Sequence, residues 1–137
     1  MVIRNGIREL ILFVLILLIS VSCNDNTEID NMLGCATSNK ITLKETYCES
    51  DFFHSEYIRI YIIKDTTLYG KIGNDFCRYD KSFKSNYCSQ DYKIYKYIKQ
   101  GAGFYRINEV SSCRFVVLYI DTMNQKLFYH DVSYTID

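Results

Sequence analysis

The stretch Phe115-Val116-Val117-Leu118-Tyr119-Ile120 is apolar at every position, and it decides the fold class. A short run without alternation is typical of a central β-strand that is covered on both faces. Outward from it, residues 127–136 (LFYHDVSYTI) alternate, so that Phe128, His130 and Val132 share one face. This spacing of two residues is the pattern of a strand rather than of a helix.

Two more segments alternate in the same way and extend the predicted sheet. In YIRIYII (57–63) the isoleucines at even positions fall on one face, and in DYKIYKYIK (91–99) Ile94 and Ile98 do the same. Polar residues typical of turns separate these segments at short intervals, as in antiparallel β domains. The sequence therefore predicts an all-β fold for residues 40–137, a small antiparallel sandwich or barrel of about seven or eight strands.

The composition limits the class of protein. The chain has 137 residues, which fits one domain, and its 16 acidic and 16 basic side chains cancel. With 48% hydrophobic and 23% charged residues, a disordered acidic tail, a collagen-like repeat and a polytopic membrane protein are excluded. Residues 24–60 contain seven acids and three bases, whereas residues 71–106 contain three acids and eight bases. This balance excludes a uniformly charged partner, and no nucleic acid is predicted.

The N-terminus has the pattern of a secretory signal. Arg4 and Arg8 precede an unbroken apolar run from Leu10 to Ile19, and polar residues return at Ser20. A permanent transmembrane helix needs about 20 apolar residues, so the shorter run is typical of a signal helix, over residues 1–22, that is cleaved after export. The polar and acidic residues that follow predict a flexible tether over residues 23–39.

Small residues precede a cysteine at the end of this signal, in Ser20-Val21-Ser22-Cys23. The segment resembles the lipobox of bacterial lipoproteins, although Ser20 stands where that family usually has Leu or another aliphatic residue. The resemblance implies that Cys23 receives a diacylglyceryl group, that the signal is cleaved before Cys23, and that the new amino group is acylated, typically with palmitate. Because Asn24 rather than Asp follows Cys23, it also implies a lipid anchor in the outer membrane, facing the periplasm or the cell surface. Ordinary cleavage after Ser22, an uncleaved anchor and a buried apolar helix are alternative interpretations.

Export would place the remaining five cysteines in an oxidising compartment where disulfides persist. They are Cys35, Cys48, Cys77, Cys88 and Cys113, and their spacing together with only two histidines does not support a zinc site. A shift of the chain by 36 residues superposes Ile58 on Ile94 and Cys77 on Cys113, as an internal duplication would. The duplication leads to a hypothesis of two disulfides, Cys48 with Cys77 and Cys88 with Cys113. If Cys23 is not lipidated, three bridges would use all six cysteines.

No residue set typical of catalysis stands out, and no metal or cofactor is predicted. His130 lies on an apolar strand face and is predicted to be a core histidine. Asp51, His54 and Glu56 are interpreted as loop residues rather than as metal ligands. The glycines of GAG at 101–103 lie between two predicted strands, so they do not form the phosphate loop that precedes a helix. The chain is therefore predicted not to be an enzyme.

Tyrosines and cations alternate on the outward faces of two predicted strands. The first stripe is Tyr57, Arg59 and Tyr61, and the second is Lys93, Tyr95, Tyr97 and Lys99. Tyrosine and arginine are enriched where proteins bind one another. The sequence thus predicts a non-catalytic domain that binds another envelope protein through these stripes, as an inhibitor or immunity protein does. A glycan-binding module that stacks sugars on the same rings is the alternative, and so is simple pairing of the stripes within the fold.

Overall fold

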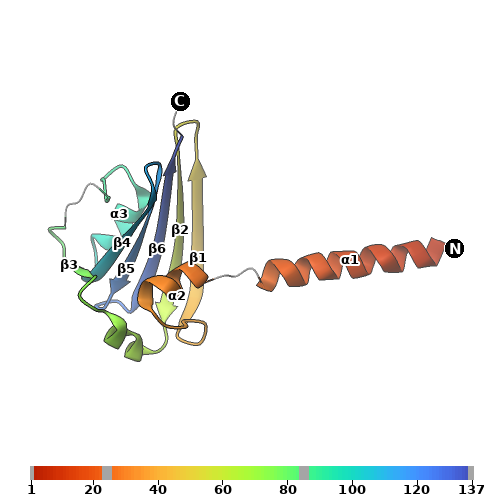
Figure 1. Ribbon diagram of the computed structural model, residues 1–137, viewed down its shortest axis with the longest axis horizontal. Coiled ribbons are helices and arrows are strands. Elements are labelled where there is room, and N and C mark those ends of the chain that lie inside the picture. The colour runs from red at the N-terminus through yellow and green to blue at the C-terminus, as the bar shows by residue number, and fades with distance from the viewer. Residues whose placement is uncertain (1, 23–25, 84–86, 136–137) are drawn as a thin grey trace.

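The structure is a computed structural model that describes residues 2–22, 26–83 and 87–135, with side chains of the first helix described over residues 6–16. Helix α1 (Val2–Ser22) covers the predicted signal segment, and Figure 1 shows it extending away from the sheet. Its described apolar side chains are exposed to solvent. Among the described residues, none of the helices has the length and apolarity that a membrane span requires. Cys23 lies outside the described residues.

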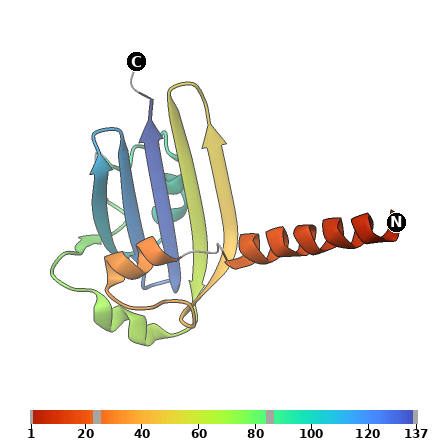
Figure 2. The ribbon, with the colours of Figure 1, turned by 45° about the vertical axis from the view of Figure 1, so that its right-hand side comes forward.

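From Asn26 onward, the described residues form one open sheet of six antiparallel strands in the order β1-β2-β6-β5-β4-β3 (Figure 2). The strands are β1 (Ile41–Ser50), β2 (His54–Ile63), β3 (Cys77–Tyr79), β4 (Gly103–Ser111), β5 (Arg114–Asp121) and β6 (Lys126–Tyr134). A mostly β fold is confirmed, but the predicted sandwich or barrel of seven or eight strands is not found. Short helices and loops, instead of a second sheet, cover the two faces in the described part of the chain.

The run that predicted a central strand forms β5. This strand lies between β6 and β4, and Phe115 to Ile120 are all buried. Within this run the even-numbered side chains belong to the apolar cluster on one face, and the odd-numbered side chains belong to the cluster on the other. The prediction that both faces of this run are covered is therefore confirmed, and the prediction of a core position for His130, opposite Ile58 and Val117, is confirmed too.

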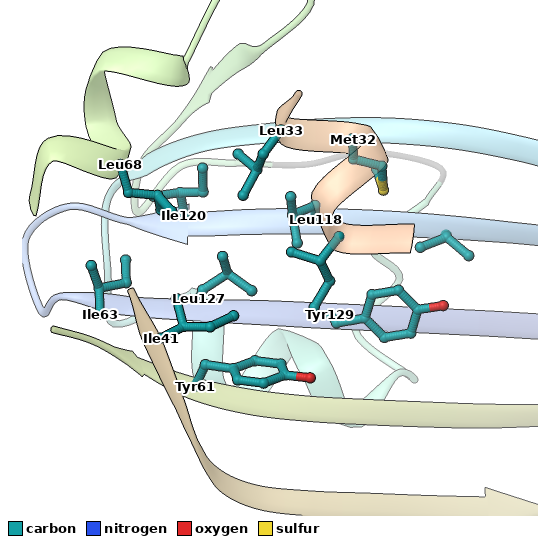
Figure 3. Packing of buried hydrophobic residues seen from close by; sticks show 12 residues of the cluster. Met32, Leu33, Ile41, Tyr61, Ile63, Leu68, Leu118, Ile120, Leu127 and Tyr129 are labelled. Atoms are coloured by element: carbon teal, nitrogen blue, oxygen red, sulfur yellow. The ribbon is translucent and has the colours of Figure 1, made fainter. Parts of the chain in front are cut away.

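Helix α2 (Thr27–Leu33) covers part of one face of the sheet, which we call the α2 face, together with the 3-10 helix η1 (Thr66–Lys71). Ile29, Met32 and Leu33 have the spacing of three and four residues that places side chains on one side of a helix. All three are buried, and Figure 3 shows Met32 and Leu33 directed toward β5.

The predicted flexible tether over residues 23–39 is thus wrong for the segment that forms α2. Three apolar side chains in seven residues are enough to attach this segment to the sheet, although its acidic composition suggested a solvated linker. The helix ends at Gly34, whose φ of 71° is the left-handed conformation that glycine adopts at helix ends. Asp30 secures the next turn, because its carboxylate accepts from the Thr37 backbone N–H and hydroxyl at 2.9 and 2.5 Å.

Helix α3 (Lys93–Ile98) and the loop before it cover the opposite face, which we call the α3 face. The predicted strand over residues 91–99 is therefore wrong. Ile94 and Ile98 are buried as expected, but a spacing of four residues fits a helix as well as a strand. The deciding contact comes from β2: the Glu56 carboxylate accepts from the backbone N–H groups of Lys93 and Ile94, both at 3.2 Å, and so caps the first turn.

The 36-residue duplication is not reflected in the fold. Ile58 lies in β2, whereas Ile94, its superposed counterpart, lies in helix α3. Cys77 lies in the edge strand β3, whereas Cys113 lies in the turn between β4 and β5. The superposed residues thus belong to different kinds of element, and their match comes from a composition rich in Ile, Tyr and Lys.

Candidate functional site

The two predicted stripes lie on opposite faces of the sheet and do not form one surface. The residues of the first stripe, Tyr57, Arg59 and Tyr61, project from β2 onto the α2 face. The second stripe, Lys93, Tyr95, Tyr97 and Lys99, belongs to α3 and its C-terminal end on the other face. Residues 93–98 form a helix on the other face instead of a strand beside β2. The prediction that the seven residues of the two stripes form one binding surface is therefore wrong.

The side chains of the second stripe make contacts within the fold. Lys93 Nζ lies 3.5 Å from the ring centroid of Tyr47 on β1, and Lys99 Nζ lies 6.0 Å from that of Tyr95. Tyr95 and Tyr97 both pack against the apolar cluster of the α3 face. These contacts are of the kind expected if the stripe pairs within the fold.

In the first stripe, Arg59 lies over tyrosine rings of the α2 face. Its Cζ is 4.4 Å from the ring centroid of Tyr129, 5.7 Å from that of Tyr57 and 5.8 Å from that of Tyr61. Attraction to the ring faces holds the guanidinium in one position. Tyr61 is buried, and its hydroxyl donates to Asn26 Oδ1 at 3.1 Å. The other two residues of this stripe, Tyr57 and Arg59, are partly accessible.

A second arginine on this face is fixed by carboxylates. Arg114 donates from Nε and Nη2 to the Asp131 carboxylate at 3.0 and 2.7 Å, and Nη2 lies 3.5 Å from Glu28 Oε2 on α2. The hydrogen bonds to Asp131 raise the pKa of Arg114 above its already high value, so the side chain stays charged. The Tyr129 hydroxyl donates to Glu28 at 2.5 Å, and burial together with this bond raises the pKa of Tyr129. Sequence reasoning missed these groups, because their contacts depend on strand register and on α2.

Helix α2 covers only part of the α2 face of the sheet. The part of this face nearer the β1–β2 hairpin is uncovered (Figures 1 and 2). We call this part the open half-face and define it by the side chains of Cys48, Ser55, Tyr57, Arg59, Asn108, Arg114, Asp131 and Ser133. All of them are at least partly accessible. Next to α2 the surface is hollowed by a pocket of ≈ 740 Å³ whose lining includes Glu28, Arg59, Arg106 and Asn108. Arg106 is fixed there, because its Nη1 donates to the Met32 carbonyl at 2.6 Å.

A histidine and a carboxylate form a buried pair on the α3 face. His130 is fully buried, and its Nε2 lies 2.9 Å from Glu56 Oε1. Burial acts to raise the pKa of Glu56, but the hydrogen bonds from His130 and from the two α3 amides outweigh it and leave that pKa lowered. Sequence reasoning missed this pair; the available signal was that Glu56 shares a strand face with Ile58 and Ile60.

The three residues interpreted as loop residues are divided by the fold. Asp51 and His54 pair at the β1–β2 hairpin, with His54 Nδ1 3.2 Å from Asp51 Oδ2. Both His54 and Glu56 lie in β2, and Glu56 is buried, so the interpretation of these two as loop residues is wrong. Within the described part of the chain no three His, Cys, Asp or Glu side chains form a group that could hold a metal ion.

The hypothesis of a Cys48–Cys77 disulfide is contradicted by the topology. Cys48 lies in β1 and Cys77 in β3, the two edges of the sheet. Strands lie about 4.8 Å apart, so the two residues are separated by roughly 24 Å, whereas a disulfide needs Cα atoms within about 7 Å. Cys88 and Cys113 are also free thiols, as is Cys35. Burial raises the pKa of the Cys88 thiol to about 11, which disfavours the reactive thiolate.

Two arginines on the open half-face contact aromatic rings and carboxylates: Arg59 lies over the ring of Tyr129, and Arg114 donates to Asp131. On the α3 face Glu56, His130 and Cys88 are buried. Comparisons with family models, with curated proteins and with solved structures find no match to this chain.

Proposed function

We propose that the chain is a cell-envelope lipoprotein, anchored through Cys23, whose β domain binds another protein through the open half-face and catalyses no reaction. The observation that carries the proposal is an accessible sheet surface on which Arg59 and Arg114 are fixed by neighbouring side chains. Side chains that are ordered in advance lose little conformational entropy on binding. Arginine and tyrosine in such settings are typical of the energetic centres of protein interfaces.

The charges of this surface favour a protein over other partners. Arg59 and Arg114 are accompanied by Asp131 and Glu28, so both signs of charge occur side by side. A nucleic acid requires an excess of cations along its phosphates. A protein surface with charges in the complementary arrangement satisfies both signs and gains specificity from them.

The glycan alternative has less support, because cations already cover the aromatic faces on which a sugar would stack. Arg59 lies over Tyr57, Tyr61 and Tyr129, and on the opposite face Lys93 lies over Tyr47. A sugar ring would have to displace these cations before it could stack. We therefore propose a protein partner and treat retention on a polysaccharide column as a test outcome.

The lipid anchor would keep the domain close to the membrane. Helix α2 begins at Thr27, so only Cys23 to Asn26 separate the anchor from the packed domain, a length of at most about 14 Å. The partner is accordingly expected to be another envelope protein within reach of the outer membrane. Intact mass of the membrane-extracted protein tests the anchor: we expect a diacylglyceryl group and an acyl chain on Cys23. An unmodified Cys23, or a chain that begins at Asn24, would contradict it.

The docking surface is tested by capture from envelope extract with two matched double variants. Tyr57→Ala with Arg59→Ala changes the open half-face, whereas Lys96→Ala with Lys99→Ala removes two exposed cations from α3 and its end. We expect a partner retained by the wild type and by the lysine variant, and lost from the other variant, with urea unfolding confirming that both are folded. Equal capture by both variants would refute this surface. Retention on a polysaccharide column without any captured protein would refute the protein partner.

A further inference from the structure

Two adjacent phenylalanines stand in solvent at the loop between β1 and β2. Phe52 is 92% accessible and Phe53 is 70% accessible, the two highest values among the large hydrophobic side chains that the structure describes. The loop lies at the end of the sheet remote from α2 (Figures 1 and 2). Isolated exposed apolar side chains are common, but two neighbouring aromatic rings form a continuous apolar patch, and such patches mark interaction sites. We call this pair the Phe tip.

The backbone of the Phe tip is held in one conformation by Asp51. Its Oδ1 accepts from the backbone N–H groups of Phe53 and His54 at 2.7 and 2.8 Å, and its own N–H donates to the His54 carbonyl at 2.9 Å. These bonds to the His54 and Phe53 amides also lower the pKa of Asp51, so the carboxylate stays ionised near neutral pH. A loop ordered in this way presents its side chains to a partner without a large entropic cost.

The end of β6 and the ring of His54 secure the base of the loop. The Thr135 backbone N–H donates to the Phe53 carbonyl at 2.9 Å. The His54 ring lies 6.4 Å from that of Tyr134 and 6.5 Å from that of Tyr92. The hairpin therefore continues the sheet as a rigid projection rather than as a loose loop.

The hairpin segment that carries the Phe tip is acidic, and the cation of α3 that lies against it, Lys93, is over the ring of Tyr47. Residues 45–58 contain four carboxylates and no Lys or Arg. Glu56 is buried, and the exposed ones near the tip are Glu49 and Asp51. Segments that insert into bacterial membranes combine aromatic residues with Lys or Arg, because the lipid surface is anionic. An aromatic tip with an acidic surround fits instead an apolar pocket that has cationic side chains at its rim.

We propose that the Phe tip inserts into an apolar, cation-rimmed pocket on the protein that this domain binds. The inference rests on the proposed function, since it names the insertion element and the chemistry of the site on the partner. Phe52 and Phe53 would fill the pocket, and Glu49 and Asp51 would face its rim. Two rigid rings that move from water into a pocket have the properties of interface hot spots, which are commonly aromatic and centrally buried.

The first test is photo-crosslinking in living cells with p-benzoylphenylalanine in place of Phe52. The matched control places it at Met123, which is 57% accessible in the turn at the other end of β5 and β6. We expect one protein adduct from position 52 and none from position 123, with the crosslinked peptide containing apolar residues next to Lys or Arg. The adduct should decrease at least about tenfold when Phe53 is replaced by Ser. Adducts with lipid alone, or equal protein adducts from both positions, would overturn the proposal.

The second test measures the affinity of the protein captured by the wild type. Each of Phe52→Ser and Phe53→Ser should weaken binding about 30-fold or more, the size typical of a hot spot. Their urea midpoints should stay at the wild-type value, because both side chains are exposed. Asp51→Asn keeps the acceptor oxygen and should weaken binding less than Asp51→Ala, which also releases the loop.

The two proposals fail in different ways. If the wild type binds its partner and both Phe variants bind it equally well, the Phe tip is refuted and the open half-face stands. If the wild type captures no protein and gives no protein adduct, both are refuted. Because the chain contains no Trp, Phe52→Trp is a single reporter for the membrane outcome. A blue shift of its emission with vesicles of phosphatidylethanolamine and phosphatidylglycerol would overturn insertion into a protein, and an unchanged spectrum is expected.

Discussion

Replacing Glu56 with Gln is expected to destabilise the domain by about 2–4 kcal/mol at neutral pH. The Glu56 side chain is buried, and Oε1 accepts from both His130 Nε2 and the Ile94 amide, while Oε2 accepts from the Lys93 amide. A Gln oxygen can replace one carboxylate oxygen, but its NH₂ group then points a donor at another donor. The loss of a hydrogen bond to a charged group and the unpaired buried N–H each cost about 1–3 kcal/mol.

The pH dependence of this effect has a defined sign. Hydrogen bonds lower the pKa of Glu56 in the folded state below its ordinary value of 4.5. Ionisation therefore contributes stability that is fully present above pH 4.5 and is lost as the pH falls through the folded pKa. The difference in unfolding free energy between the wild type and Glu56→Gln should be largest near neutral pH and should shrink in acid.

Urea unfolding followed by circular dichroism, at neutral pH and at successively lower pH, measures both quantities. Glu49→Gln is the matched control, because this exposed carboxylate of β1 accepts one hydrogen bond, from the Tyr47 hydroxyl at 2.9 Å. Its urea midpoint should stay close to that of the wild type. A loss below about 0.5 kcal/mol for Glu56→Gln, or a loss that does not change with pH, would refute the role of the charged cap.

Three further substitutions or measurements test the fold itself. Gly103→Ala should cost at least about 2 kcal/mol, because its Cβ would lie 1.9 Å from the Ile120 carbonyl oxygen, whereas Gly73→Ala meets no atom within 4 Å and should be nearly neutral in urea unfolding. If α2 is part of the core, Ile29→Ala should lower the free energy of unfolding by about 2–5 kcal/mol, whereas replacing the exposed Asn31 with Ala should change it little. Equal and small effects of the two substitutions would support the flexible tether instead. A thiol reagent should modify the exposed Cys48 and Cys77 rapidly and the buried Cys88 only on unfolding, and a peptide map that joins Cys48 to Cys77 would contradict the sheet order.

The sheet was predictable from sequence because its signal is local. In β2, β5 and β6 the apolar positions recur every second residue or fill the whole strand, and this alone determines which side chains enter the two clusters. Helix α3 was not predictable in this way, since Ile94 and Ile98 satisfy both periods. What decides it is Glu56, a residue 37 positions earlier whose side chain caps the helix. Local periodicity contains no record of that contact.

The candidate site was predicted in part. Tyr57 and Arg59 were singled out and lie on the open half-face, but the burial of Tyr61 depends on α2, which the acidic composition of residues 24–30 concealed. Arg114 was not singled out, because Asp131 becomes its partner only once β5 and β6 are paired in register. A residue whose partner lies on a neighbouring strand can be recognised only when the order of the strands is known. The alternation of apolar and polar residues within one strand does not reveal that order.

The open half-face and the Phe tip are close enough to contact a single partner. Arg59 and Phe53 are six residues apart along the β1–β2 hairpin and β2, so they are separated by roughly 20 Å. An ordinary protein interface covers about 800 Å² on each partner, a patch roughly 30 Å across. A partner of ordinary size thus reaches both, with the tip in its pocket and the arginines against its surface. At this separation the losses of affinity from Arg59→Ala and Phe53→Ser should add. Strong coupling between them would show instead that one substitution displaces the other residue, and would mean that the hairpin is less rigid than its hydrogen bonds indicate.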